Sequence, residues 1–314
     1  TCVVHCAIAA GFYLLMFNFN EVQSALLGQF VGAAGLGGIY ALTLTIFSRH
    51  ANPDRMMGIF MFVQIIFTSG FILALSTLIT RYGSFGISGS LAVASLLIIP
   101  CLAWFPQRDE RASVTEPGAG PRPQLKLGLP LLLALASLGL FGLNTAGVAS
   151  YLERMGKFAG LGLDDITLYV AIGNLVSIVG PALAVWWGDK FNRLVPLLLA
   201  VSCNVAAMLL LWNGGNHWLY PIGASLFFIS WMLGLPYLYA TVAALDETRT
   251  VMPIAAVVLV VGSAAAPVFA GAFVSSDTFN GVNLYGIACI IGCYALVIRV
   301  LVRSKPAAQS GSPL

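Results

Sequence analysis

The sequence has 314 residues, of which 59% are hydrophobic and 9% are charged, and its formal net charge is +3. Soluble globular proteins average about 25% charged residues. A water-facing surface over the whole chain is therefore excluded, and membrane lipid is the expected solvent for most of it. The small net charge, without basic blocks interleaved with aromatic residues, argues against nucleic acid as a partner.

Ten apolar stretches follow one another along the chain. They cover residues 1–17, 24–47, 56–79, 84–105, 127–151, 166–187, 194–212, 217–240, 252–274 and 280–302. After the first, each is long enough to cross about 30 Å of hydrocarbon at about 1.5 Å per residue. The predicted fold class is all-α, a polytopic transmembrane helical bundle.

Basic residues predict the orientation of these helices. With the loop after the second stretch placed in the cytoplasm, only Arg81, Arg154 and Lys157 of the 15 basic residues fall outside. The positive-inside rule requires such a bias. We therefore expect an integral membrane protein, in a bacterial inner membrane, with its longest linker and its C-terminus in the cytoplasm.

That longest linker divides the chain. Residues 106–126 are rich in Pro, Gly and charge, a composition that cannot bury a core. We expect four helices in residues 1–105, this cytoplasmic linker, six helices in residues 127–305 and a flexible tail at 306–314.

The two parts also look related in sequence. Leu36-Gly37-Gly38-Ile39-Tyr40 resembles Leu233-Gly234-Leu235-Pro236-Tyr237, and Met57-Gly58-Ile59 resembles Met252-Pro253-Ile254 at nearly the same offset. Internal repeats that face each other across a midplane site are typical of secondary transporters.

Two motifs give the chain a resemblance to the major facilitator superfamily. Trp187-Gly-Asp-Lys-Phe-Asn-Arg193 is similar to the family's cytoplasmic loop motif, although Val185 and Asn192 replace its two glycines. The Gly-rich stretch 24–47, with its exit Ser48-Arg-His-Ala-Asn-Pro-Asp-Arg55, is similar to family helix four.

The resemblance implies twelve helices in two pseudo-symmetric halves that rock to give alternating access. Two helices are then expected to be missing before Thr1, so that the sequence is N-terminally truncated. It also implies that Asp189, Lys190 and Arg193 form a conformational latch that holds one state closed. The alternative is that these residues are solvated loop charges and orientation signals.

Neutral polar and aromatic residues in the predicted helices are the candidates to line a substrate cavity. The family resemblance places Tyr40 and Tyr237 on helices that line the central path. The full candidate set is Gln29, Tyr40, Gln64, Thr68, Asn144, Tyr151, Asn174, Ser177, Ser230, Trp231 and Tyr237. For Gln64, Thr68, Asn144, Tyr151, Asn174 and Ser177, interhelical hydrogen bonds are an equally good interpretation.

No Asp, Glu, Lys or Arg lies near the middle of any apolar stretch. A buried proton-relay carboxylate is therefore not visible, although a coupling proton stays possible. Residues at the helix rims, Glu21, Glu153 and Asp165, could serve instead, with Glu153 the preferred titrating group. Its alternative is an interfacial anchor.

The six cysteines lie in apolar runs, and Cys2/His5/Cys6 and Cys289/Cys293 have helical spacing. A metal site would be possible there, but small packing residues are the better interpretation. We expect no cofactor, no metal and no enzymatic activity, since the three histidines are scattered. The predicted function is a secondary transporter of a small organic solute, acting as a monomer. The alternative is a non-transporting membrane sensor on the same fold.

Overall fold

The computed structural model describes residues 37, 39–48, 52–101, 128–187, 192–212, 216–246, 251–275 and 278–303. Within these ranges the regular structure is entirely helical. The chain forms two compact units, one of Thr1–Leu44 with Gly70–Leu125 and one of Thr45–Ser69 with Lys126–Leu314. Each unit is described by itself.

The first described helix is Ile39–Ser48, which is followed by α3 (Pro53–Tyr82) and α4 (Ser84–Cys101). Asn52 begins α3, because its Oδ1 atom accepts the Arg55 amide at 3.1 Å. Pro53 at the first helical position already has the φ that a helix needs. Gly83, at φ 58, joins α3 to α4 in the left-handed conformation that favours glycine.

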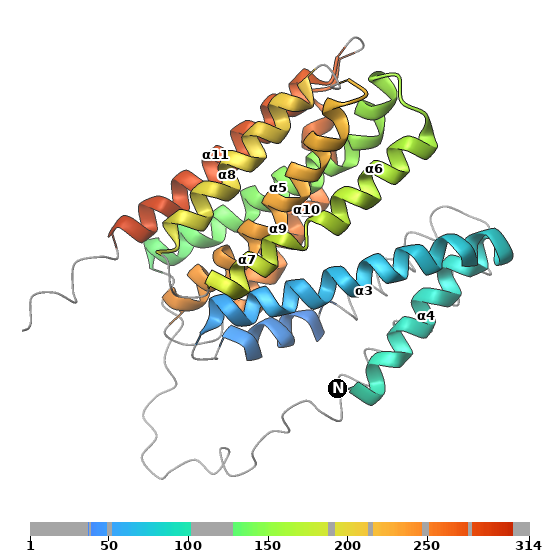
Figure 1. Cartoon of the computed structure of the whole chain (residues 1–314). Helices are drawn as coiled ribbons and strands as arrows, with labels where there is room; N and C mark the ends of the chain where they lie inside the picture. The colour runs from blue at the N-terminus through green and yellow to red at the C-terminus, as the bar shows by residue number, and fades with distance from the viewer. Residues whose placement is uncertain are drawn as a thin grey trace, which may run out of the picture. The chain divides into compact units, whose positions relative to one another are not determined.

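The second unit contains α5 (Leu129–Phe158), α6 (Leu163–Val176), α7 (Val179–Trp187), α8 (Leu194–Leu210), α9 (Leu219–Leu245), α10 (Met252–Gly271) and α11 (Asn280–Arg303). α5 packs against α10 and α11, and α8 packs against α9 and α11, with α8 and α11 side by side in Figure 1. α6 and α7 both pack against α9.

The predicted helix 166–187 is broken into α6 and α7. Pro181 has no backbone N–H, so it cannot continue the hydrogen-bond ladder to Ser177. The Gly180 amide instead donates to the Ser177 carbonyl at 2.9 Å, one residue tighter than an α-helical bond. The two segments still follow one path and together make a 25-residue apolar span.

Five helical segments among the described residues are long and apolar enough to cross a membrane. They differ in burial: 72% of the α9 window is buried but only 28% of the α10 window. On α10, Val257, Val261 and Val268 share one face and are 59%, 61% and 77% exposed. α9 is therefore the central helix of the unit, and α10 presents an apolar stripe suited to lipid.

α5 and α10 approach each other closely through glycines. A Cβ atom added at Gly142 would lie 2.5 Å from the Leu259 carbonyl oxygen, and one added at Gly262 would lie 2.5 Å from the Gly139 carbonyl oxygen. Small residues at membrane helix interfaces allow such backbone contact.

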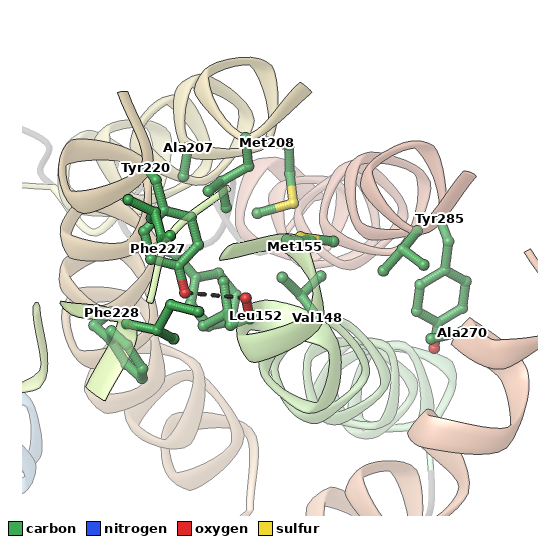
Figure 2. Close-up of a cluster of buried hydrophobic side chains, with 14 residues drawn as sticks. Val148, Leu152, Met155, Ala207, Met208, Tyr220, Phe227, Phe228, Ala270 and Tyr285 are labelled. Carbon is green, nitrogen blue, oxygen red and sulfur yellow. Dashed lines mark hydrogen bonds between the residues drawn. The ribbon is translucent and has the colours of Figure 1, made fainter. Parts of the chain in front are cut away.

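The end of the unit at which α6, α9 and α11 begin is held together by a cluster of buried apolar side chains (Figure 2). Met155, Met208 and Phe227 lie in it, from α5, α8 and α9. The Tyr220 hydroxyl donates to the Leu152 carbonyl at 3.0 Å, drawn as the dashed line in Figure 2. This hydrogen bond ties α9 to α5 within the cluster.

Candidate functional site: an ion pair between α3 and α8

The opposite end of the unit, where α5, α8 and α10 begin, carries a bidentate ion pair between Asp54 and Arg193. Arg193 Nε donates to Asp54 Oδ1 at 3.0 Å and to Oδ2 at 3.1 Å, and Nη2 donates to Oδ2 at 2.8 Å. The Asp54 side chain is 6% exposed and that of Arg193 is 24% exposed. We call this pair the latch pair.

Each partner is held at a helix end. Asp54 lies in the first turn of α3, where the helix dipole favours a negative charge. Arg193 is the N-cap residue of α8, where the same dipole disfavours a positive charge. The dipole of α8 therefore does not account for the position of Arg193, whereas the Asp54 carboxylate does.

The two partners are 139 residues apart in sequence, and α3 also contacts α7 at Gly58. A Cβ atom added at Gly58 would lie 3.1 Å from the Ala184 Cβ atom and 3.2 Å from the Val185 backbone nitrogen. Further along α3, Ser69 accepts a hydrogen bond of 3.5 Å from Asn174 of α6. α3 thus contacts α7 near its start and α6 near its middle.

The latch pair forms strong hydrogen bonds, and removing only one of its two charged side chains is strongly destabilising. Bidentate arginine–carboxylate bonds are about twice as strong as neutral hydrogen bonds. Removing one partner of a buried pair costs about 3–5 kcal/mol, because the other charge stays buried without compensation. Separation into water costs much less, since both charges are then solvated. The pair is therefore suited to a contact that forms in one state and dissolves in another.

Comparison with known proteins identifies the fold. No protein-family model and no curated protein sequence matches the chain. Among solved structures, the transporter FucP in the outward conformation matches with a TM-score of 0.72 at 15% identity, over 95% of this chain and 82% of that one. The chain has the major facilitator fold. The predicted fold class is thereby confirmed, and the chain is an integral membrane protein.

Two further structures of the major facilitator fold agree. A variant of the E. coli fucose:proton symporter FucP matches with a TM-score of 0.68 at 12% identity, over 95% of this chain and 82% of that one. The human organic anion transporter MFSD10 (TETRAN) matches with a TM-score of 0.64 at 16% identity, over 96% of this chain and 75% of that one.

Of the predicted latch residues, Arg193 lies in the described part of the fold, and Asp189 and Lys190 lie outside it. The partner that Arg193 binds, Asp54, was not among the predicted site residues. Its only sequence signal is its place in the Pro53-Asp54-Arg55 turn, which belongs to the motif at the exit of the preceding helix.

Two predicted cavity residues lie in a buried polar network between helices. Asn144 of α5 pairs with Asn204 of α8, and Asn204 Nδ2 also donates to Ser230 Oγ of α9 at 2.9 Å. Asn144 Nδ2 donates to the Gly286 carbonyl of α11 at 2.7 Å. Asn144 and Asn204 are fully buried and Ser230 is 2% exposed, so the network joins four helices of the major facilitator fold.

Tyr151 and Trp231 are half-buried and lie beside the apolar cluster. The Tyr151 hydroxyl donates to the Pro267 carbonyl at 3.2 Å. The Trp231 ring stacks on Phe228, with centroids 6.3 Å apart and planes 15° apart.

Gln64 and Thr68 lie on α3, exposed and half-buried respectively, and Asn174 on α6 is half-buried. Ser177 is buried at the break, where its hydroxyl donates to the Asn174 carbonyl. The polar contact between the two helices is the one from Asn174, near the C-terminal end of α6, to Ser69 in the middle of α3.

The remaining predicted residues fall in different places. Gln29 lies outside the described residues, and Tyr40 belongs to the first compact unit whereas Tyr237 belongs to the second. Their equivalence stays a prediction. Glu153 is exposed at the far end of α5 and pairs with Lys157 one turn along the same helix.

The cysteines of the second unit, Cys203, Cys289 and Cys293, are free. Among the residues that the structure describes, no group of three or more His, Cys, Asp or Glu side chains could hold a metal ion. The first Cys/His group, at residues 2–6, lies outside that part of the chain.

Proposed function

We propose that the chain is a secondary transporter that moves a small organic solute by alternating access. In this proposal the latch pair closes the predicted cytoplasmic end in one state and dissolves in the other. The observation that carries it is the buried bidentate contact between Asp54 and Arg193, which joins the start of α3 to the loop motif before α8.

The structural neighbours support this proposal. One of the matching structures is the transporter FucP in the outward conformation. A second neighbour is a fucose:proton symporter and a third is an organic anion transporter, so a small solute, with or without a coupled proton, is the expected cargo.

Within the proposed cavity, the side chains divide by their hydrogen bonds. Asn144 and Ser230 are engaged by protein groups and hold helices together. Gln64, Thr68 and Asn174 are less buried: the first two lie near the middle of α3, and Asn174 lies near the break between α6 and α7. Polar groups at that depth are costly against lipid. We therefore assign these three, ahead of the buried network, to contact with the solute.

The latch is tested by cysteine accessibility in the membrane. A Thr241→Cys probe near the end of α9 is introduced into the protein with its six natural cysteines replaced, and labelled with an impermeant thiol reagent in inside-out vesicles. Thr241 is 1% exposed, so labelling reports opening of this end. Asp54→Asn should increase the labelling rate at least about tenfold, because it leaves the arginine buried without its countercharge.

A charge exchange provides the matched control. Asp54→Arg combined with Arg193→Asp restores an opposite-charge pair and should lower the labelling rate towards that of the parent. Equal labelling rates in Asp54→Asn, in the exchange and in the parent would refute the latch.

Transport itself is tested by a thermal-shift screen of the purified protein against neutral sugars, polyols and organic anions. A ligand that binds only the native state at a hundredfold excess stabilises it by about 2.7 kcal/mol. Stabilising compounds are then tested for counterflow in proteoliposomes. Binding without counterflow would favour the sensor alternative instead.

A further inference from the structure

Tyr237 of α9 has a buried hydroxyl without a hydrogen-bond partner among the described residues. Its side chain is 1% exposed, and it lies within electrostatic range of both Asp54 and Arg193. A buried polar group without a hydrogen bond destabilises the fold, because it has lost its hydrogen bonds to water and has no protein partner to replace them. Such a group in a native structure requires an explanation.

Other tyrosines in the same unit do find partners. The Tyr220 hydroxyl donates to the Leu152 carbonyl at 3.0 Å, and the Tyr285 hydroxyl donates to the Leu143 carbonyl at 3.0 Å. Buried tyrosine hydroxyls in this unit therefore form hydrogen bonds where a backbone carbonyl lies close enough. Tyr294 shares the unpaired state of Tyr237, but its hydroxyl lies against Gly234, one turn away on α9.

Because Tyr237 lies within electrostatic range of both charges of the latch pair, separation of the pair would change the surroundings of its hydroxyl. While the pair is intact, the end of the unit is closed above it, since Asp54 is only 6% exposed. When the pair separates, water reaches this region, and the released carboxylate of Asp54 becomes free to accept a hydrogen bond. The hydroxyl, which has no partner among the described residues here, would then gain one on opening.

We propose that the Tyr237 hydroxyl destabilises the latched state selectively and so keeps the latch reversible. This inference rests on the proposed function, because it assumes that the latch pair opens and closes. Tyr237 is in this view a positioning residue for the conformational equilibrium and not a solute-binding residue. Removing its oxygen removes the unsatisfied group from the latched state and the new hydrogen bond from the open state.

The test is Tyr237→Phe, measured with the Thr241→Cys labelling assay. We expect the labelling rate to fall by about fivefold or more, the smallest effect that an unsatisfied buried hydroxyl predicts. Should the Phe variant not yield folded protein, Tyr237→Met also lacks the hydroxyl and should lower the rate in the same direction.

Two matched variants separate this effect from general stability. Tyr294→Phe removes another unpaired buried hydroxyl, one that belongs to α11, and should leave the labelling rate unchanged. Tyr220→Phe removes a hydroxyl that is paired, and should lower the melting temperature without slowing the labelling. A fall of equal size in Tyr294→Phe would overturn the inference, because the effect would then be general stabilisation.

The outcomes for Asp54 and Tyr237 are distinguishable. If Asp54→Asn increases labelling and Tyr237→Phe leaves it unchanged, the latch stands and the role of Tyr237 is refuted. If neither changes labelling, the proposed latch fails as well. In the Asp54→Asn background the effect of Tyr237→Phe should shrink, because the latched state is already depopulated.

Discussion

Asn144 and Asn204 form a reciprocal amide pair across two helices. Asn144 Nδ2 donates to Asn204 Oδ1 at 3.4 Å, and Asn204 Nδ2 donates to Asn144 Oδ1 at 3.3 Å. Both side chains are fully buried. The pair therefore fixes the register of α5 against α8, because a shift of either helix would leave two buried amides unsatisfied.

The first prediction concerns this pair. Asn204→Leu should lower the free energy of unfolding by about 1–3 kcal/mol, because it leaves the Asn144 amide buried with fewer partners. The double variant Asn144→Leu/Asn204→Leu should lose less than the sum of the single variants. Thermal melting in detergent measures both, and Ser202→Ala on the exposed face of α8 is the neutral control. Strict additivity would show that the two amides are not coupled.

A second prediction concerns the close approach of α5 and α10. Gly142→Ala places a Cβ atom 2.5 Å from the Leu259 carbonyl oxygen, so the helices must separate. We expect a loss of about 1–3 kcal/mol. In Gly292→Ala the added atom would lie 3.4 Å from Leu140 Cδ1, an ordinary contact, so its melting temperature should stay near that of the parent. Equal melting temperatures for the two variants would contradict the packing.

The third prediction uses the contact of Tyr294 with Gly234. A Cβ atom at Gly234 would collide with the Tyr294 hydroxyl oxygen. Gly234→Ala alone should therefore destabilise the protein by about 1–3 kcal/mol. Tyr294→Phe removes the colliding atom and should restore most of the melting temperature in the double variant. No rescue would mean that the strain arises elsewhere around Gly234.

A fourth prediction tests the orientation in the membrane. Ser275 and Asn216 are exposed in turns at one end of the second unit, and Asn192 is exposed at the other. Single cysteines at Ser275 and Asn216 should react with an impermeant thiol reagent added outside the cell, and one at Asn192 should not. The opposite pattern would reverse the predicted topology while leaving the fold unchanged.

The helices were predictable from sequence, because a long apolar run in a membrane must satisfy its backbone hydrogen bonds internally and an α-helix does so. The predicted stretch 252–274 is α10 to within three residues, and 280–302 is α11 to within one. The break between α6 and α7 was not predicted, although Gly180-Pro181 was visible. A membrane helix can either absorb such a pair or be interrupted by it, and the neighbouring helices decide which.

The candidate site was only partly predictable. Arg193 could be singled out because it lies in a motif, whereas its partner Asp54 is 139 residues away and nothing local connects them. Asn204 was missed altogether, since one Asn in an apolar run carries no periodic signal. Its role depends on Asn144 and Ser230, which only the packing of α5, α8 and α9 brings to it.

The break after Ser177 also determines how far the end of α7 moves when the two helical segments bend against each other. α7 has nine residues, and at about 1.5 Å per residue it is about 13 Å long. A bend of about 10° at the break would displace its far end by about 2 Å. A bend of this size would therefore alter the packing of α7 against Gly58 of α3, the helix that carries Asp54.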